Sequence, residues 1–327
     1  MTTRQELPAA RTAAAGADEA ADLGTLLVRA AARFPEHGLR YCSGERPPGH
    51  TLCTCPRLLD ESLRLLAALR DAGARPGRVV ALMLERPEDF LPALWACLLG
   101  GITACPLVPL RNDPQRWAAQ LRHVDALLER PLLITDRRTR EELPAGPGPA
   151  VVIVEDLVRA AAGTDASTVV TSTCASDEVA LLVLTSGSTG AAKAVRLTHG
   201  NLLASMAAKA GAQSLTADDV TLNWISYDHV AALLEAHLLP LSVGAVQLQA
   251  SPESVLADPR HFLELIDAHR VTMTFTPNFL LGLIGKALDG DHQRQRARLR
   301  LPGAVRRRLV PGDRLGRRGR PARRRSG

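Results

Sequence analysis

The feature that most constrains the fold of this 327-residue chain is a regular alternation of short apolar runs with amphipathic helical patterns. The apolar runs at 79–84, 131–135 and 178–184 are nearly continuous, without the alternating polar residues of a half-exposed strand. Strands that are apolar on both faces need cover on both faces, as in parallel sheets with helices on each side. The sequence therefore predicts an α/β fold made mainly of parallel sheets flanked by helices.

Local signals set the order of these elements. Leucines at helical spacing over 57–71 end before Gly73, and Asp113 before Pro114 is a typical helix start. The predicted helices are 26–34, 57–71, 86–101, 112–130, a segment from 199, 230–241, 258–270 and 277–288. The predicted strands are 79–84, 102–108, 131–135, 150–155, 178–184, 194–198, 219–225, 245–249 and 271–276.

Composition divides the chain into three parts. Residues 1–23 are rich in alanine and are predicted to be a flexible N-terminus, while residues 24–287 carry the strand and helix pattern. Residues 288–327 contain fourteen arginines and three aspartates, about +11 of charge, which leaves about −5 for the rest of a chain whose net charge is +6. With few apolar residues and no periodicity, this Arg-rich tail is predicted to be disordered, with its sequence resembling out-of-frame translation.

Two features bear on the cellular compartment. Residues 90–110 lack charge and are long enough to span a membrane, but Gly100, Gly101 and three prolines favour a buried helix followed by a buried strand. Six cysteines show no paired spacing typical of a metal site or a disulfide framework, and no secretory signal precedes them. We therefore expect reduced thiols, no metal site, no membrane segment and a cytoplasmic protein.

A loop rich in glycine and hydroxyl residues follows the apolar run at 178–184. The segment reads LTSGSTGAAKAVRLTHGN from Leu184 to Asn201. Glycines let the backbone approach a ligand closely, and successive N–H groups with hydroxyls suit phosphate oxygens. The spacing is wrong for the P-loop pattern, which needs four residues between its glycines and Ser or Thr after its lysine. On composition alone, an ordinary solvated turn remains the alternative.

The order of residues in this loop is more specific. The string T-S-G-S-T-G-A-A-K-A-V, followed by LTHGNLL, resembles the signature of the adenylate-forming (AMP-binding) superfamily: acyl-CoA synthetases, fatty acyl-AMP ligases and nonribosomal peptide synthetase adenylation domains. Ala192 and Ala194 stand where that pattern usually has Pro and Gly. The resemblance covers residues 24–287, which implies an incomplete large N-terminal domain of such an enzyme.

The resemblance implies a function. A carboxylic or amino acid would be activated with ATP and Mg²⁺ as an acyl- or aminoacyl-adenylate and passed to a thiol of CoA or of a carrier-protein phosphopantetheine, in secondary metabolism or acyl activation. The phosphates of ATP would be held by a set of loop residues, which are Thr185, Ser186, Gly187, Ser188, Thr189, Gly190 and Lys193.

A second candidate site lies at Tyr227-Asp228-His229. The resemblance implies that Asp228 could pair with a substrate ammonium or that His229 could lie by the acyl group, while Asp228 could also merely cap the following helix. Asn278 begins another helix whose N-terminus could face the substrate. His199 and Asn201 are expected to support the helix after the glycine loop.

Several pieces of the family pattern are missing. We find no aromatic-Gly-x-[ST]-Glu motif for adenine, no ribose-binding Asp and no C-terminal lysine that would contact the attacking carboxylate. The sequence therefore predicts a truncated or frameshifted chain that could be inactive alone. The alternatives are a non-catalytic remnant or interaction module, and nonspecific nucleic-acid binding through the Arg-rich tail. The acid, the acceptor thiol and the oligomeric state stay open.

Overall fold

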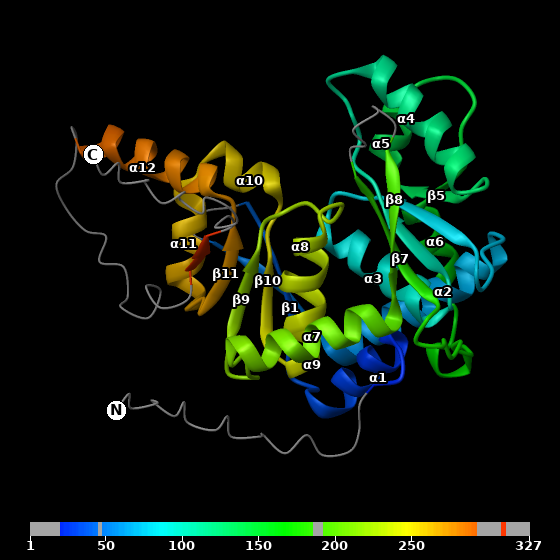
Figure 1. Cartoon of the computed structure of the whole chain (residues 1–327), viewed down its shortest axis with the longest axis horizontal. Coiled ribbons are helices and arrows are strands. Elements are labelled where there is room, and N and C mark those ends of the chain that lie inside the picture. The colour runs from blue at the N-terminus through cyan, green and yellow to red at the C-terminus, as the bar shows by residue number, and fades with distance from the viewer. Residues whose placement is uncertain (1–19, 45–47, 186–191, 293–308, 312–327) are drawn as a thin grey trace, which may run out of the picture.

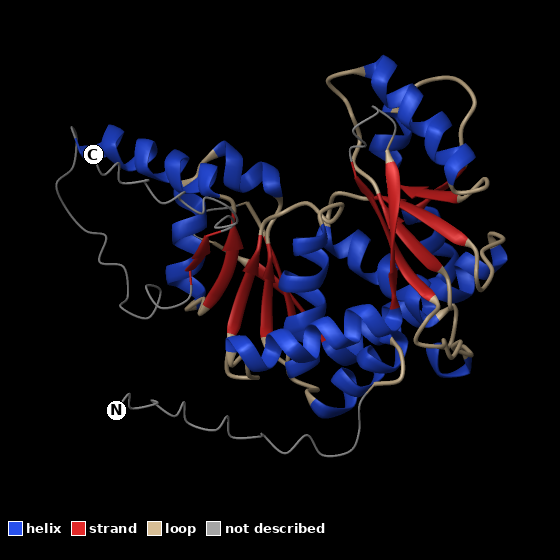
Figure 2. Cartoon of the chain, viewed as in Figure 1, coloured by secondary structure: helices blue, strands red, loops and turns tan. Residues whose placement is uncertain are grey.

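Two six-stranded sheets form two lobes joined by helices in the computed structural model, which describes residues 20–44, 48–185, 192–292 and 309–311 (Figure 1). Helices cover the sheets, and most strand pairs are parallel (Figure 2). The predicted class, mainly parallel sheets flanked by helices, is confirmed. Ser186, Gly187, Ser188, Thr189 and Gly190 of the predicted site lie outside the described residues.

Sheet 1 has the strand order β6-β5-β3-β4-β7-β8. Its strands are parallel except for β7 and β8, which form an antiparallel hairpin at one edge. Since βαβ crossovers connect the parallel strands, the connecting helices pack around this sheet. These helices are α3 (Pro87–Leu99), α4 (Pro114–Leu127), α5 (Arg137–Glu142) and α6 (Val154–Ala161). The bounds of the strands are β3 Val79–Met83, β4 Thr103–Pro106, β5 Leu132–Thr135, β6 Ala150–Ile153, β7 Val179–Thr185 and β8 Lys193–Thr198.

Sheet 2 has the strand order β12-β11-β9-β10-β1-β2. All neighbouring strands pair in parallel except β1 and β2, which form an antiparallel hairpin. The bounds are β1 Gly38–Cys42, β2 His50–Thr54, β9 Val220–Asn223, β10 Val246–Gln249, β11 Met273–Thr276 and β12 Leu309–Pro311.

Some helices lie beside one of the two sheets, and others pack between the sheets. Helix α3 is buried over nearly its whole surface, and its side chains belong to the largest apolar cluster, which also includes residues of α1, α2 and α9. Helices α10, α11 and α12 lie beside sheet 2 at the far side from sheet 1 (Figure 1). The bounds are α1 Leu23–Arg33, α2 Cys55–Asp71, α3 Pro87–Leu99, α4 Pro114–Leu127, α5 Arg137–Glu142, α6 Val154–Ala161, α7 His199–Gln213, α8 Val230–Leu233, a π-helical turn Leu234–Leu238, α9 Leu239–Val243, α10 Pro252–Ala257, α11 Arg260–His269 and α12 Asn278–His292.

The structure also contains elements that the sequence patterns did not indicate. The hairpin β1–β2 was missed because β2 is mostly exposed and lacks an apolar run, and the short helices α5, α6 and α10 were missed as well. The predicted helix 230–241 is interrupted by the π turn. Helix α12 continues to His292, and Leu309–Pro311 pairs with β11, so described structure extends past residue 287.

The uncharged segment 90–110 is a buried helix followed by a buried strand, as predicted. Helix α3 ends at Leu99, Gly101 adopts a positive φ of 66°, and β4 begins at Thr103. Among the described helices, none combines the length and apolarity needed to cross a bilayer. All six cysteines are free thiols.

Candidate functional site

The glycine loop joins β7 to β8 at the edge of sheet 1. Thr185 ends β7 and lies opposite Lys193, which begins β8. The Thr185 hydroxyl donates to the Lys193 carbonyl at 3.4 Å. The imidazole of His123 on α4 donates from Nε2 to the carbonyl of Ala192 at 2.7 Å, which fixes the base of the loop against a helix. The two described ends of the loop are therefore held in a defined position.

The segments on either side of this hairpin are also anchored. Thr198 caps α7 by accepting from the Asn201 amide at 3.1 Å, and the Asn201 side chain accepts from the Thr198 amide at 3.4 Å, a capping box. Nδ1 of His199, which is 3% exposed, accepts from the amide of Leu23 at 3.1 Å. His199 and Asn201 thus support the start of α7 as predicted, and they tie it to the N-terminal helix.

Lys193 is the charged residue at this end of the hairpin. Its side chain is exposed, and among the described residues it has no hydrogen-bond or ion-pair partner. An exposed lysine ammonium without a partner in the described part of the chain is a donor suited to phosphate oxygens rather than to a cation. The described ends of the loop are therefore compatible with a nucleotide triphosphate.

The second candidate site is the turn from Trp224 to His229, between β9 and α8. Asp228 is half-buried and makes no hydrogen bond or ion pair with the described residues. His229 is the N-cap of α8, because its Nδ1 accepts from the Ala231 amide at 3.1 Å. The capping role that the sequence left open for Asp228 therefore belongs to His229, and the Asp228 carboxylate remains available.

The turn is held by side chains that sequence analysis did not single out. Asn223 accepts from the Ile225 amide at 3.0 Å and donates to the Ile225 carbonyl at 3.2 Å. Tyr227 stacks on Phe90 of α3 with ring centroids 4.3 Å apart and an interplanar angle of 3°. Its hydroxyl donates to Oε1 of Gln249 at 2.8 Å. The signal that could have revealed Asn223 and Gln249 was a polar residue at the carboxyl end of each strand, in segments where polar and apolar residues alternate.

The π turn after α8 carries a buried histidine. His237 is fully buried, its Nε2 accepts from Nε1–H of Trp95 at 2.8 Å, and its Nδ1 donates to Oε1 of Gln247 at 2.8 Å. Burial lowers the pKa of His237 to about 4, so the ring is neutral near pH 7. Such π turns are frequent near functional sites. This one places His237 against Trp95 of α3.

Both candidate segments follow the carboxyl ends of parallel strands, β7 in sheet 1 and β9 in sheet 2. In open α/β sheets, ligands bind outside these ends. A cavity of about 670 Å³ lies where β3 and β4 end and where β10 leads into α10, and its lining includes Arg86, Arg111 and Glu253. Of the predicted site residues that the structure describes, none lines it. The cavity therefore adjoins the carboxyl ends without defining the site.

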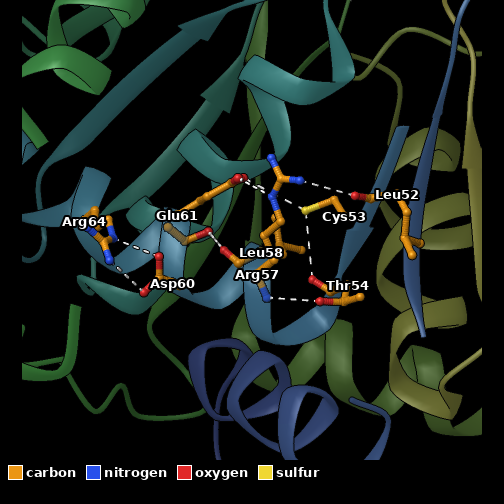
Figure 3. Close-up of polar contacts among 9 residues, drawn as sticks. Leu52, Cys53, Thr54, Arg57, Leu58, Asp60, Glu61 and Arg64 are labelled. Atoms are coloured by element: carbon orange, nitrogen blue, oxygen red, sulfur yellow. Dashed lines mark hydrogen bonds and ion pairs between the residues drawn. The ribbon is translucent and has the colours of Figure 1, made fainter. Parts of the chain in front are cut away.

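Ionisable groups also gather on α2 (Figure 3). Arg57 pairs with Glu61 at 2.7 Å, and Arg64 pairs with Asp60 at 2.8 Å, each between residues four apart. These exposed pairs satisfy one another along the helix, so they support α2 rather than form a site. Within the described ranges, no group of three or more His, Cys, Asp or Glu side chains is placed to hold a metal ion.

Comparison with known proteins identifies the family. The family described as AMP-binding enzyme matches residues 27–319. The chain belongs to this AMP-binding family. The match includes the glycine loop, the Asp228 turn and part of the Arg-rich segment, and it confirms the superfamily inferred from the loop.

Relatives of this AMP-binding chain include biosynthetic synthetases. It is 34% identical over 266 residues to "Atromentin synthetase invA1" of Paxillus involutus, covering 81% of this chain but 28% of that protein. The structure "McyG A-PCP complexed with phenylalanyl-adenylate" matches with a TM-score of 0.75 and 30% identity over 83% of this chain and 43% of that one. The adenylation domain of a keto acid-selecting module bound to keto acyl adenylate matches with a TM-score of 0.75 and 26% identity over 84% of this chain and 50% of that one. The chain thus spans less than a third of this curated relative and at most half of these two solved proteins.

Proposed function

We propose that this chain serves ATP-dependent activation of a carboxylic acid, with formation of an acyl- or aminoacyl-adenylate. The observation that carries the proposal is the family match over residues 27–319 together with the glycine-loop hairpin, whose Lys193 ammonium has no partner among the described residues. In this reaction the carboxylate attacks the α-phosphate of ATP and pyrophosphate leaves. The protein's main task would be to orient the reactants and to stabilise the charge that develops on the departing phosphates.

The hairpin would supply that stabilisation. Lys193 and the Thr185 hydroxyl would hold the β- and γ-phosphates together with Ser186, Gly187, Ser188, Thr189 and Gly190. Mg²⁺, bound with ATP, would neutralise further phosphate charge. Donors fixed in advance toward developing negative charge contribute strongly to catalysis, and removal of a single one typically lowers kcat by about 10²–10³-fold.

The Asp228 turn would bind the substrate acid. A half-buried carboxylate without a partner in the described part of the chain suits a substrate ammonium. Because Nδ1 of His229 accepts from Ala231, the neutral ring carries its proton on Nε2, which could donate to the acid. Two structural relatives support amino acids and α-keto acids as the substrate class, since one holds phenylalanyl-adenylate and the other a keto acyl adenylate. The acceptor would be a thiol of CoA or of a carrier-protein phosphopantetheine, and the A-PCP form of the first relative favours a carrier protein.

The experiment that tests the proposal is acid-dependent ATP–pyrophosphate exchange on the purified chain. We expect exchange with a member of a panel of amino, α-keto, aryl and fatty acids, and its reduction by about 10²-fold or more in Lys193→Ala. Arg196→Ala is the matched control, because Arg196 is an exposed cation on the same strand.

Two results would oppose the proposal. One is the absence of exchange with every acid in a chain shown to be folded by circular dichroism and a cooperative thermal transition, which would instead favour a non-catalytic module. The other is an equal loss in Arg196→Ala and Lys193→Ala, which would point to charge on β8 in general rather than to the lysine of the loop.

A further inference from the structure

A chain of buried hydrogen bonds runs from α3 to the turn that carries Asp228. It begins with Trp95, which donates to His237, and continues from His237 Nδ1–H to Oε1 of Gln247. The Gln247 oxygen also accepts from Nε2 of Gln249 at 3.2 Å. Oε1 of Gln249 accepts in turn from Nδ2 of Asn223 at 3.1 Å and, as described above, from Tyr227. This buried amide network therefore joins α3, the π turn, β10 and the Asp228 turn.

Gln249 has the central place in the network. It is 0% exposed, and its side-chain oxygen accepts one hydrogen bond from Tyr227 of the turn and one from Asn223 at the end of β9. Its side-chain nitrogen donates to Gln247 and to the Ala236 carbonyl at 3.4 Å. Ala236 lies in the π turn, a conformation that changes the i→i−4 pattern of the helix and can leave a carbonyl for an outside donor. A buried amide with partners for both its oxygen and its nitrogen has one preferred orientation, since rotation would leave donors facing donors.

The two neighbouring amides make different contacts. Gln247 holds the π turn through His237, and its hydrogen-bond partners in the described part of the chain include no residue of the Trp224–His229 turn. Gln249 contacts Tyr227, which directly precedes Asp228, and Asn223, which in turn holds both backbone groups of Ile225. Loss of Gln249 therefore releases the turn at two points, while loss of Gln247 releases the π turn.

We propose that Gln249 is a positioning residue for the acid pocket: through Tyr227 and Asn223 it fixes the turn that presents Asp228 and His229 to the substrate. Its role in selecting the acid rests on the proposed function, whereas its role in ordering the turn does not. Gln249 itself contacts no substrate atom in this scheme. Its effect should appear in the affinity for the acid and leave the affinity for ATP unchanged, because the glycine-loop hairpin lies in the other sheet.

Hydrogen exchange with mass spectrometry measures the ordering role directly. In Gln249→Met, which keeps the length of the side chain but removes its donor and acceptors, amides in a peptide covering residues 224–231 should exchange about tenfold faster than in the wild-type chain. Peptides from α2 should exchange at the wild-type rate. Tyr227→Phe is a second, milder variant, since it removes only the hydroxyl and keeps the ring stacked on Phe90; it should accelerate the same peptide by about threefold.

Gln247→Met is the matched control, because Gln247 is also a buried glutamine of β10 and belongs to the same hydrogen-bond network. It should accelerate exchange in the π turn and leave the Trp224–His229 turn close to its wild-type rate. The proposal is overturned if Gln247→Met accelerates the turn as much as Gln249→Met does, or if Gln249→Met accelerates α2 equally, because either result describes general loosening. Wild-type exchange rates at the turn in both Gln249→Met and Tyr227→Phe would overturn it as well.

A kinetic split then tests the link to the acid. In ATP–pyrophosphate exchange, Gln249→Met and Tyr227→Phe should raise KM for the acid by about tenfold and threefold and leave KM for ATP unchanged. A merely structural role would lower the active fraction and hence kcat, with both KM values unchanged, and that result would contradict the proposal. If the wild-type chain shows no exchange with any acid while the turn still loosens in Gln249→Met, the proposed function fails and the ordering role stands.

Discussion

The two sheets differ in the kinds of side chains that they bury. In sheet 1, the buried side chains of the central strands are mainly apolar, as in the run Val80 to Met83 of β3. Helix α3, which packs against them, is also apolar. In sheet 2, buried apolar and polar residues alternate along β9 and β10: Leu222 and Leu248 belong to one apolar cluster, whereas the residues beside them are amides or hydroxyls. Because side chains alternate between faces of a strand, one face of sheet 2 is apolar and the other is polar although both are buried.

This difference assigns the sheets different tasks. Apolar packing is nondirectional, so sheet 1 can present its hairpin with little dependence on any single polar contact. Buried amides require partners in defined positions, so the polar face of sheet 2 specifies one arrangement of the π turn and of the Asp228 turn. We interpret sheet 1 as the scaffold for phosphate binding and sheet 2 as the part that would distinguish one acid from another.

The largest stability effect should come from the apolar core at α3. Leu94 is 0% exposed, and Leu94→Ala should lower the free energy of unfolding by about 3 kcal/mol, through lost burial and the cavity left behind. Chemical denaturation measures this loss. Leu127→Ala on α4 is the control, because Leu127 is 39% exposed and should cost less than about 1 kcal/mol. Similar losses at both positions would contradict the picture of α3 as a closely packed core.

The polar face should instead give a pH-dependent effect through His237. Unfolded, this histidine takes up a proton below about pH 6.5, whereas burial lowers the pKa of the folded side chain to about 4. The unfolded state therefore binds more protons between these values, and the free energy of unfolding should fall as the pH drops from about 6.5 to 4, by about 2–3 kcal/mol. Denaturant titrations at several pH values measure this slope.

His237→Gln isolates that contribution, since glutamine can still accept from Trp95 and donate to Gln247 but does not titrate. As the pH falls, the free energy of unfolding of the wild-type chain should fall relative to that of His237→Gln. Asp89 of α3 acts in the opposite direction, because burial raises its pKa to about 6 and favours the folded state as the pH falls toward 4. Only the difference from His237→Gln is therefore diagnostic, and a parallel pH dependence in both chains would rule out a neutral buried histidine.

The smallest effect should come from the cap of α7. Thr198→Ala removes the capping box and should lower the free energy of unfolding by about 1 kcal/mol. Thr171→Ala, at an exposed threonine outside any helix or strand, should change it by less than about 0.5 kcal/mol. An effect of Thr198→Ala no larger than that of Thr171→Ala would show that burial of His199, rather than the capping box, holds the start of α7.

Sequence reasoning could predict the elements whose signal is local. Continuous apolar runs gave the strands of sheet 1, and Asp113 gave the start of α4, because strand burial and helix capping are properties of a few adjacent residues. The glycine loop could be placed between two strands for the same reason. The predicted roles of Thr185, Lys193 and the loop between them, and of Asp228, in ligand binding remain predictions.

Contacts between distant segments were beyond such reasoning. The parallel pairing of β1 with β10 joins residues more than 200 positions apart, and nothing in either strand specifies the other. The hydrogen bond between Trp95 and His237 joins residues 142 positions apart. It explains why a histidine can be buried in this helix, which the helical pattern alone could not show. The polar residues of β9 and β10 were visible, but their partners become apparent only when α3, the π turn and sheet 2 are brought together.

The most direct test of the account compares exchange kinetics in Lys193→Ala, Asp228→Asn and the wild-type chain, with an amino acid and its matching α-keto acid. We expect the rate of ATP–pyrophosphate exchange to fall by about 10²-fold or more in Lys193→Ala with both acids, because the lysine would act on ATP. The account also predicts that Asp228→Asn loses activity mainly with the amino acid, whose ammonium would lose its charged partner. If Lys193→Ala retained full exchange, or if Asp228→Asn affected both acids equally, the division between a phosphate-binding sheet 1 and an acid-selecting sheet 2 would be contradicted.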